Sequence, residues 1–387
     1  MGVAIMTEIK VDNVQNAAGS GKPNFPVSPT HSAGSALSTL NTYSYTSSGS
    51  EPSSPKNGAL WWDSGNDKVM VYIAGEFKEI ELNASSGGGA VWYGARALFF
   101  AGYTTAASAN VNTIQYVAPA TTGNAQDFGD VTVARSDGAA CSNGTRAIFG
   151  GGYASALVNV IDYVTTATTG NAQDFGDMLE TGSGHAALSD GTKGVFAGGY
   201  MSTSSNAVVN TIQFVTIDTA GNMADFGDLL ATQRRMAGTS DATRGLFAGG
   251  EGPSNVIQYI TIANAGNATD FGDLTQAHQK LSGASDATRS LFMGGEQSSS
   301  PYRLNIISYV TTANAGNATD FGDLTEVAET HDSTNDDIYA VRGGGNNGSG
   351  RSNVIDRVTI QTAGNAADFG DLLAGNQGLK GSSGAAS

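Results

Sequence analysis

The sequence predicts an all-β fold: a six-bladed β-propeller preceded by an extended arm and a small three-stranded β meander. One phrase, GNxxDFGD, occurs six times. The intervals between its phenylalanines are 47, 51, 45, 50 and 48 residues, a period typical of propeller and solenoid repeats. Short apolar runs separated by Gly, Ser, Asn and Asp fill the space between copies. The 53 glycines also argue against helix, since each costs a helix about 1 kcal/mol relative to alanine.

Each repeat supplies four short segments in the same order. A Ser/Asp/Gly stretch with a basic end leads into an apolar run that closes on glycines, as in SDATRGLFAGG at 240–250. An Asn-x-Ile strand follows, with an aromatic residue two positions after the isoleucine, and Arg357 replaces this aromatic in the last copy. The phrase itself is the fourth segment. Because a lone four-stranded sheet cannot bury both its faces, we expect the six repeats to stack as blades.

The two ends of the repeat region predict how the propeller closes. The first repeat begins with its apolar run, at 97–103, whereas the chain after the last DFGD stops before such a run. We therefore expect Leu379 to Ala386 to supply the missing strand of the first blade. The alternative is that Ala90 to Tyr93 take that position.

The repeated DFGD is predicted to be part of the scaffold. DFG is also the metal-binding motif of protein kinases, but neither a Gly-rich phosphate loop nor HRD accompanies the six copies. We expect the phenylalanine to fill the space between blades, the glycine to allow close backbone approach, and the aspartates to accept hydrogen bonds from turn amides. The paired aspartates match no DxDxDG calcium loop, so this hydrogen-bonding role is favoured over calcium binding.

The composition limits the partners. Nineteen basic and 35 acidic residues give a net charge of −16, which excludes nucleic acid or an anionic membrane held by bulk electrostatics. The opening apolar run is too short for a signal peptide, the myristoylation pattern fails, and no later stretch is long enough to span a membrane. We therefore expect a soluble chain that is neither secreted, lipidated nor inserted in a membrane.

Cysteine and histidine give no catalytic or metal site in the sequence. Cys141 is the single cysteine, at a position that other repeats fill with Ser, Thr or Leu, so we expect a packed residue and not a nucleophile. Four histidines have no partner at metal-ligand spacing, and we expect surface or turn positions for His31, His185, His278 and His331. We predict no enzyme activity, no metal site and no cofactor.

The first 89 residues have a different composition. Residues 1–58 contain a short polar strand at 8–15 and are then dominated by Gly, Ser, Thr, Pro and Asn, which cannot bury enough apolar surface to fold alone. We interpret them as an extended arm and linker. Residues 59–89 contain three alternating runs separated by SGND and AGE, which predicts the meander. Residues 90–387 are the predicted propeller.

Two families resemble these segments. LFAGG, N-x-I-x-Y and DFGDL resemble the kelch repeat of β-propellers over residues 90–387, with phenylalanine where kelch repeats usually carry tryptophan. EIKVDNVQNAAGSGKPNFP and SPKNGALWWDSGNDKVMVYIAGEFKEI resemble the amino-terminal regions of bacteriophage tail-fibre and related virion structural proteins, notably of phages infecting marine cyanobacteria. In that group the amino-terminal arm docks to the particle and fibres are usually trimers. The resemblance thus implies a virion protein, assembled in the host cytoplasm as a homotrimer.

One loop carries all the length variation between repeats. Between the Gly-Gly pair and the Asn-x-Ile strand, the second to sixth repeats have 6, 10, 4, 9 and 7 residues, and subtracting these from the intervals leaves 41 each time. Equivalent propeller loops emerge on one face, so this face is the candidate for partner contact; the alternative is a solvated rim that tolerates insertions. Aromatic rings suit sugars or protein surfaces. The candidate contact residues are Tyr103, Tyr153, Tyr200, Tyr302, Arg303 and Arg351.

Together these features predict a non-enzymatic virion protein, a tail fibre or fibre-like appendage. Residues 1–58 would bind other virion or tail proteins, and the propeller loops would face a host-surface polysaccharide or protein. One alternative is a structural collar, nozzle or decoration protein that contacts only other virion proteins. Another is a glycan-cleaving depolymerase, which would need an acid/base pair that the sequence does not display.

Overall fold

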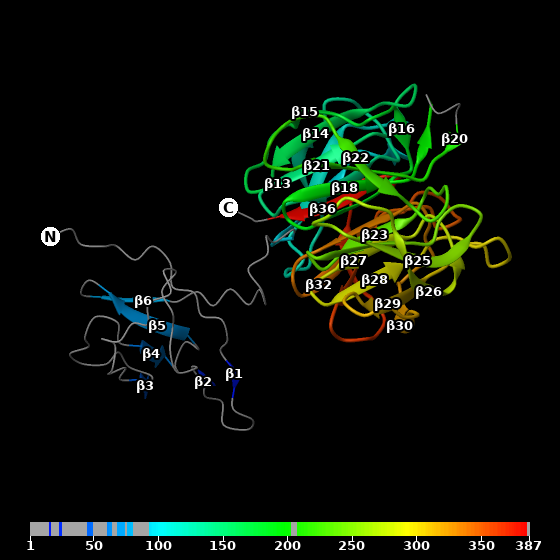
Figure 1. Cartoon of the computed structure of the whole chain (residues 1–387). Helices are drawn as coiled ribbons and strands as arrows, with labels where there is room; N and C mark the ends of the chain where they lie inside the picture. The colour runs from blue at the N-terminus through cyan, green and yellow to red at the C-terminus, as the bar shows by residue number, and fades with distance from the viewer. Residues whose placement is uncertain are drawn as a thin grey trace. The chain divides into compact units, whose positions relative to one another are not determined.

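The computed structural model describes residues 93–202 and 207–384, together with six strands nearer the amino terminus, β1 to β6. Contacts divide the chain into two compact units, Met1–Ala84 and Ser85–Ser387, and each is described by itself (Figure 1). All the regular elements of the described residues are β-strands, so the all-β prediction is confirmed.

The second unit contains six four-stranded antiparallel sheets, one for each repeat. They are numbered in chain order, and their strands are given from the inner to the outer one. Sheet 1 is β36 (Lys380–Gly384), β7 (Arg96–Phe100), β10 (Thr113–Val117) and β11 (Gln126–Asp130). Sheet 2 is β12 (Ala139–Ser142), β13 (Arg146–Gly150), β14 (Val160–Thr165) and β15 (Gln173–Asp177). Sheet 3 is β17 (Ala186–Ser189), β18 (Lys193–Ala197), β21 (Thr211–Thr216) and β22 (Ala224–Asp228).

The second half of the unit repeats this arrangement. Sheet 4 is β23 (Ala237–Ser240), β24 (Arg244–Ala248), β25 (Ser254–Thr261) and β26 (Thr269–His278). Sheet 5 is β27 (Ser282–Ser285), β28 (Arg289–Met293), β29 (Ile306–Thr311) and β30 (Thr319–Asp323). Sheet 6 is β31 (Asp332–Asn335), β32 (Tyr339–Gly343), β33 (Val354–Thr359) and β34 (Ala367–Asp371).

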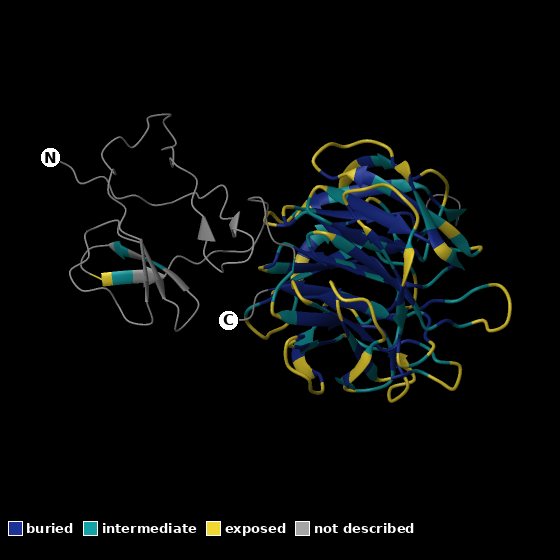
Figure 2. Cartoon of the chain, turned by 90° about the horizontal axis from the view of Figure 1, so that it is seen from below, coloured by how far each residue is buried: buried dark blue, intermediate teal, exposed yellow. Residues whose placement is uncertain are grey.

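The six sheets contact one another in a closed cycle. Their inner strands pack in the order β36, β12, β17, β23, β27 and β31, and β31 packs against β36 again. Six clusters of buried apolar side chains lie between neighbouring sheets, and one of them joins sheet 6 to sheet 1. Buried residues fill the strands, whereas exposed residues gather in the loops (Figure 2). Each sheet therefore buries both its faces against its neighbours.

The last described strand closes this cycle. β36 pairs in antiparallel register with the whole length of β7. Sheet 1 thus combines three strands of the first repeat with one from the end of the chain, which confirms the predicted closure for residues 380–384. The alternative, in which residues 90–93 take this position, is wrong because β36 occupies it. Residues 385–387 lie outside the described part of the chain.

Six peptide groups form a second closed cycle, directly before the inner strands. Each N–H donates to the carbonyl of the equivalent residue in a neighbouring repeat, at N···O distances of 2.8 to 3.1 Å, until the cycle returns to its start. All six residues have φ between 56° and 73°, the left-handed region that glycine adopts without strain. We call this cycle the peptide ring. In donor-to-acceptor order its members are Asp137, Gly378, Thr330, Lys280, Arg235 and Gly184.

The GNxxDFGD phrase joins neighbouring sheets at their outer strands. Its phenylalanines are buried between sheets, as predicted, with at most 3% of each exposed. A Cβ on Gly129 would lie 2.3 Å from the carbonyl oxygen of Gly170, so glycine is required for this close approach. The prediction that the aspartate carboxylates accept hydrogen bonds is wrong. The backbone N–H of Asp130 donates to the side-chain oxygen of Asn171 in the next phrase, at 3.1 Å, because the backbone N–H of the aspartate, and not its carboxylate, faces the asparagine. The same bond recurs in all six repeats.

A basic residue at the start of the second strand forms a further bracket between sheets. Arg146, for example, lies 4.5 Å from the centre of the Tyr163 ring and donates to the carbonyl of Ile217 in the next sheet at 3.0 Å. Equivalent cation–ring contacts occur in sheets 1, 3, 4 and 5. In sheet 6 the partners are exchanged: Tyr339 takes the basic position and Arg357 the aromatic one, 4.5 Å apart. This exchange explains why Arg357 interrupts the sequence pattern.

The first unit contains a four-stranded sheet where the sequence predicts three strands. The predicted antiparallel meander is present as β4 (Leu60–Asp63), β5 (Lys68–Ile73) and β6 (Glu76–Glu79). β3 (Tyr45–Ser48) pairs with β4 in parallel, so the prediction of an extended arm over residues 1–58 is wrong at residues 45–48. Pairing with β4 satisfies the backbone hydrogen-bonding groups of β3. β1 (Gln15–Asn16) pairs with β2 (Pro23–Asn24). The polar strand predicted at 8–15 lies almost wholly outside the described residues, and the boundaries at 58 and 89 stay predictions.

Candidate partner-binding face

The variable loops and the connectors between sheets emerge together. In each antiparallel sheet, the loop between the second and third strands lies at the same edge as the connector to the next sheet. We call this edge the variable face. Its loops, from sheet 1 to sheet 6, are 103–111, 153–158, 200–209, 251–254, 296–304 and 346–352. Its connectors are 131–138, 178–185, 229–236, 274–281, 324–331 and 372–379, and the first five residues of 274–281 continue β26. Residues 203–206 lie outside the described part.

Hydrogen bonds hold each variable loop to a connector. The second glycine of each Gly-Gly pair, and Gly102 in sheet 1, donates its N–H to a connector carbonyl at 2.7 to 3.1 Å. These glycines have φ between 98° and 127°, which explains why the repeat requires glycine where the chain turns onto the face. Two loops also form small three-stranded sheets with connectors. These sheets are β35 (Asn376–Gln377), β8 (Tyr103–Thr104) and β9 (Ala109–Asn110), and β16 (Gly182–Ser183), β19 (Tyr200–Met201) and β20 (Ala207–Val208).

Three of the predicted contact residues lie in stacked pairs. The Arg351 guanidinium lies 4.2 Å from the centre of the Tyr103 ring, across the junction of sheets 6 and 1. The Tyr103 hydroxyl donates to the carbonyl of Ser108 at 2.6 Å. Arg234, from a connector, lies 5.1 Å from the centre of the Tyr200 ring. These contacts cover ring faces that a ligand would otherwise stack on, so they hold the loops in place.

Tyr153 and Tyr302 are the exposed members of the predicted set, with exposed fractions of 48% and 61%. The Tyr153 carbonyl accepts a hydrogen bond from Asn110 in the loop of sheet 1 at 2.8 Å. Arg303, next to Tyr302, pairs with Glu329 at 2.7 Å. The two tyrosines belong to sheets 2 and 5, which are three positions apart in the cycle of six. The structure thus places the predicted residues on one face but does not bring them into one cluster.

A charged network covers the part of the variable face formed by the loops of sheets 4 and 5. Arg234 holds Glu251 through two N–H groups, at 2.7 and 2.5 Å, and Arg235 contacts the same carboxylate at 3.1 Å. The Arg234 hydrogen bond holds the pKa of Glu251 below its usual value. Lys280 lies 2.8 and 2.7 Å from two further carboxylates. The network consists of Arg234, Arg235, Glu251, Lys280, Glu296, Arg303 and Glu329.

Glu296 and Glu329 share Lys280 within this network. Burial and the hydrogen bond with Glu329 raise the pKa of Glu296. Burial opposes ionisation of Glu329 too, but hydrogen bonds with Glu296 and Lys280 lower its pKa. The two carboxyl groups of a glycosidase lie about 5–9.5 Å apart, with the substrate between them. A pair that shares Lys280, with Glu329 also held by Arg303, is engaged in ion pairs and does not fit that chemistry.

Exposed apolar side chains concentrate on the variable face. Of the eight large apolar side chains exposed in the described residues, seven lie in its loops or connectors. The eighth, Ile338, lies in a turn at the opposite edge. The seven side chains are spread over the loops and connectors around the cycle of sheets, so they distinguish this face without forming one patch on it. The seven are Val133, Tyr153, Leu179, Leu230, Tyr302, Val327 and Leu373.

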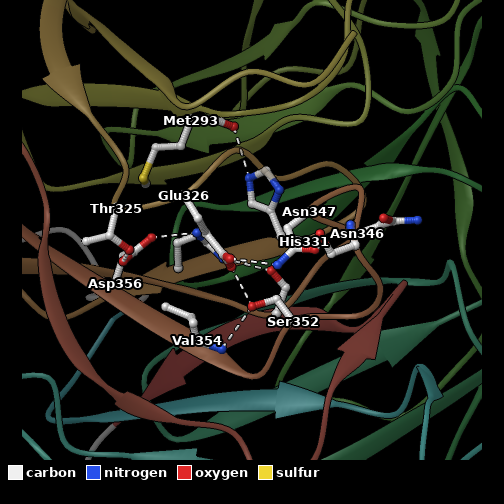
Figure 3. A network of polar contacts seen from close by, with 12 residues as sticks. Met293, Thr325, Glu326, His331, Asn346, Asn347, Ser352, Val354 and Asp356 are labelled. Carbon is white, nitrogen blue, oxygen red and sulfur yellow. Dashed lines mark hydrogen bonds and ion pairs between the residues drawn. The ribbon is translucent and has the colours of Figure 1, made fainter. Parts of the chain in front are cut away.

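Sheet 6 contains a buried polar network beneath its variable loop (Figure 3). Arg342 is 1% exposed and takes the position that phenylalanine holds in sheets 1 to 5. Its guanidinium contacts Asp356, directly opposite on β33, at 2.5 Å. Glu326 lies 3.4 Å from Arg342 and accepts hydrogen bonds from Asn347 and Ser352. Burial raises the pKa of Asp356. The network therefore anchors the loop at 346–352 to the sheet.

Sequence reasoning missed this network and a related one in sheet 2. There Asp162 takes the position of Asp356, and Arg135, from a connector, contacts it at 2.8 Å and stacks over Phe149. Burial lowers the pKa of Arg135. The signal in the sequence is the residue between the isoleucine and the aromatic: sheets 1, 3 and 4 have glutamine there and sheet 5 serine, so the two aspartates stand out.

Three histidines are buried, so the prediction of surface or turn positions is wrong for them. His185, His278 and His331 are at most 2% exposed, and His31 lies outside the described residues. The reason is the missing Cβ of the Gly-Gly pairs: a Cβ on Gly199 would lie 2.3 Å from the His185 ring. Burial lowers the pKa of His185 and His278 to about 4 and that of His331 well below its usual value. All three are therefore neutral at pH 7 and serve packing.

The inner strands surround a cavity of about 80 Å³ on the axis of the cycle. A Cβ on Gly238 would lie 2.2 Å from the carbonyl oxygen of Ala187 in the neighbouring strand, so these strands approach closely. Ligand pockets typically measure about 300–1,000 Å³, and a space this small suits ordered water. Cys141 is buried in the inner strand of sheet 2, as predicted, and burial raises the pKa of its thiol.

Within the described ranges, no group of three or more His, Cys, Asp or Glu side chains is placed to hold a metal ion. No helix in that part of the chain is long and apolar enough to cross a membrane. Comparison with models of protein families finds no match for this chain, and comparison with curated proteins finds none either. The resemblances to kelch propellers and to phage tail-fibre proteins therefore stay predictions.

Proposed function

We propose that the six sheets are the blades of a six-bladed β-propeller, and that the chain is a non-enzymatic bacteriophage virion protein, a tail fibre or fibre-like appendage. Its variable face binds a ligand on the host surface. The cyclic packing of the inner strands supports the propeller. The observation that carries the binding role is that seven of the eight exposed large apolar side chains of the described residues lie on the face whose loops differ.

The path of the chain supports this orientation. β7 begins at the edge opposite the variable face. β36 ends at that same edge, where Gly384 bridges Gly144 in a turn of sheet 2. Neither described end of the six sheets therefore lies on the variable face. Docking to the particle through residues 1–58 and assembly as a homotrimer are what the resemblance to phage fibres implies.

Binding of the purified protein to cells of marine cyanobacterial strains tests the proposal. Tyr153→Ser and Tyr302→Ser each remove an exposed ring from the variable face and are expected to lower the bound fraction. Ile338→Ser is the matched control, because it removes an exposed apolar side chain from the opposite edge. Binding lost equally in all three variants, or absent from the parent protein on every strain, would contradict the proposal.

A structural role in contact with other virion proteins is the second candidate. The stacks of Arg351 on Tyr103 and of Arg234 on Tyr200 favour it. They hold the loops in place and cover rings that a receptor-binding site would leave free. An image of the intact virion separates the two roles: a variable face covered by other virion proteins would end the host-binding role. Release of reducing sugar from host polysaccharide would instead revive the depolymerase alternative.

A further inference from the structure

The charged network carries an excess of positive charge in an acidic protein. Four basic minus three acidic side chains leave a net charge of +1, in a chain whose net charge is −16. The pairing is uneven, because Lys280 and Arg303 contact two glutamates whereas Arg234 and Arg235 share Glu251. One guanidinium charge is therefore not compensated. Arg235, with 39% of its side chain exposed against 23% for Arg234, is the more accessible of the two.

The backbone conformation of Arg235 and Lys280 disfavours both residues. They are members of the peptide ring, with φ of 60° and 56°. Gly184 and Gly378 take equivalent positions, where glycine is free of strain. The Lys280 N–H donates to the Arg235 carbonyl at 2.9 Å, so the two cationic side chains start from neighbouring points near the axis. Strained residues of this kind often persist where the side chain has a functional role.

The side chains of the network are partly exposed, and the loop of sheet 5 supplies an aromatic ring. The loop of sheet 4, which carries Glu251, has only 4 residues and lies between loops of 10 and 9 residues. The loop of sheet 5 contributes both Arg303 to the network and the adjacent Tyr302, whose ring is exposed. An exposed ring on the loop that supplies a cation of the network matches the two chemical features of an acidic sugar, an apolar ring face and an anionic substituent.

We propose that Arg234, Arg235 and Lys280 form a subsite for the carboxylate of an acidic polysaccharide, such as a uronate polymer, and that Tyr302 stacks on a sugar ring. This inference rests on the proposed host-binding function and specifies its ligand class. Glu251 indicates how the subsite binds a carboxylate, because the Arg234 guanidinium donates two hydrogen bonds to the Glu251 carboxylate. A ligand carboxylate takes up the uncompensated charge through the donors of Arg235 that Glu251 leaves unused.

The peptide ring provides matched variants for the test. Arg235→Gly removes the cation at a φ that suits glycine, so the fold is retained. Thr330→Gly makes the same backbone change at an equivalent position, with φ of 58°, and removes no charge. Binding of the full chain to polygalacturonate, dextran and dextran sulfate is measured by isothermal titration calorimetry. We expect polygalacturonate to bind and dextran not to bind. Arg235→Gly should weaken binding at least about tenfold, and Thr330→Gly should leave it unchanged.

The outcomes separate this inference from the proposed function. Equal binding of dextran, binding of dextran sulfate in place of polygalacturonate, or equal weakening by Thr330→Gly overturns the carboxylate subsite. So does a protein that binds host cells but not polygalacturonate, and the host-binding function then still stands. A protein that binds neither host cells nor any of the three polymers overturns both.

Discussion

Restoring the repeat pattern in sheet 6 would test whether the cation–ring bracket stabilises the cycle of sheets. Arg357 lies 4.5 Å from the centre of the Tyr339 ring and donates to the carbonyl of Pro119 in sheet 1 at 3.0 Å. Arg357→Tyr removes the cation and leaves two aromatic rings side by side. Tyr339→Arg removes the ring and leaves two cations side by side. The double substitution recreates the arrangement found in sheets 1, 2, 4 and 5.

The contacts set the expected magnitudes. A partly exposed cation–ring contact contributes about 0.5–1 kcal/mol, and a hydrogen bond from a charged group about 1.5–3 kcal/mol. Arg357→Tyr should therefore lower the free energy of unfolding by about 2–4 kcal/mol, and Tyr339→Arg by about 1 kcal/mol. In the double variant the introduced arginine regains a ring. It can also reach the next sheet, as Arg289 does by donating to Ile360 at 2.9 Å, so the loss should stay below about 1 kcal/mol.

Urea denaturation of the four proteins, followed by far-UV circular dichroism, measures these differences. Comparable m-values would show that compactness is unchanged. We expect the double variant to be more stable than the sum of the two single losses by at least about 1.5 kcal/mol. If its loss equals that sum, the bracket contributes no coupling, and the apolar clusters alone hold the sheets together.

Three further measurements test other contacts. Phe271→Ala should lower the free energy of unfolding by about 3–5 kcal/mol, because its buried ring would leave a cavity between sheets 4 and 5; a mutant that melts like the parent would rule this out. Thr330→Gly should leave the melting temperature unchanged or raise it, since a β-branched residue at φ of 58° is strained, and a loss above about 1 kcal/mol would refute the strain. Acidification should destabilise the protein between pH 6.5 and 4 by about 3 kcal/mol for each of His185 and His278, as measured by urea midpoints. Their folded pKa of about 4 lies below the unfolded value of 6.5, so stability that is present above pH 6.5 is lost as protons bind the unfolded chain. The raised pKa of Asp356 acts in the opposite direction, and a His278→Gln variant with the same pH dependence as the parent would contradict the assignment.

Repetition made the sheets and their closure predictable. The alternation of Ile257 and Tyr259 recurs in other copies, so a single strand assignment was supported by several independent segments. The first repeat lacks an inner strand, and the tail at 379–386 has no apolar run of its own to pair with. This indicated the pairing of β36 with β7. The position of the variable loops followed from the same count, because every other connection has a fixed length.

Contacts between distant segments account for what the sequence did not reveal. His185 lies in a polar segment, and its burial depends on the space left by Gly199. Arg342 interrupts an apolar run, and only its place opposite Asp356 explains how a charge is tolerated there. Tyr200 belongs to the residue type expected at a binding face, but an arginine from a connector covers its ring. None of these partners follows from local spacing.

The pairing of β36 with β7 also orders events during synthesis. While the ribosome translates sheets 2 to 6, β7 has no partner on its inner side. Phe99 also lacks its packing contacts with sheet 6 and Leu379. An unpaired strand edge of this kind can template association with another nascent chain. β7 is paired only after residue 384 has left the ribosome. A ribosome that stalls before residue 380 therefore leaves the edge of β7 unpaired and able to associate with other nascent chains on the same message.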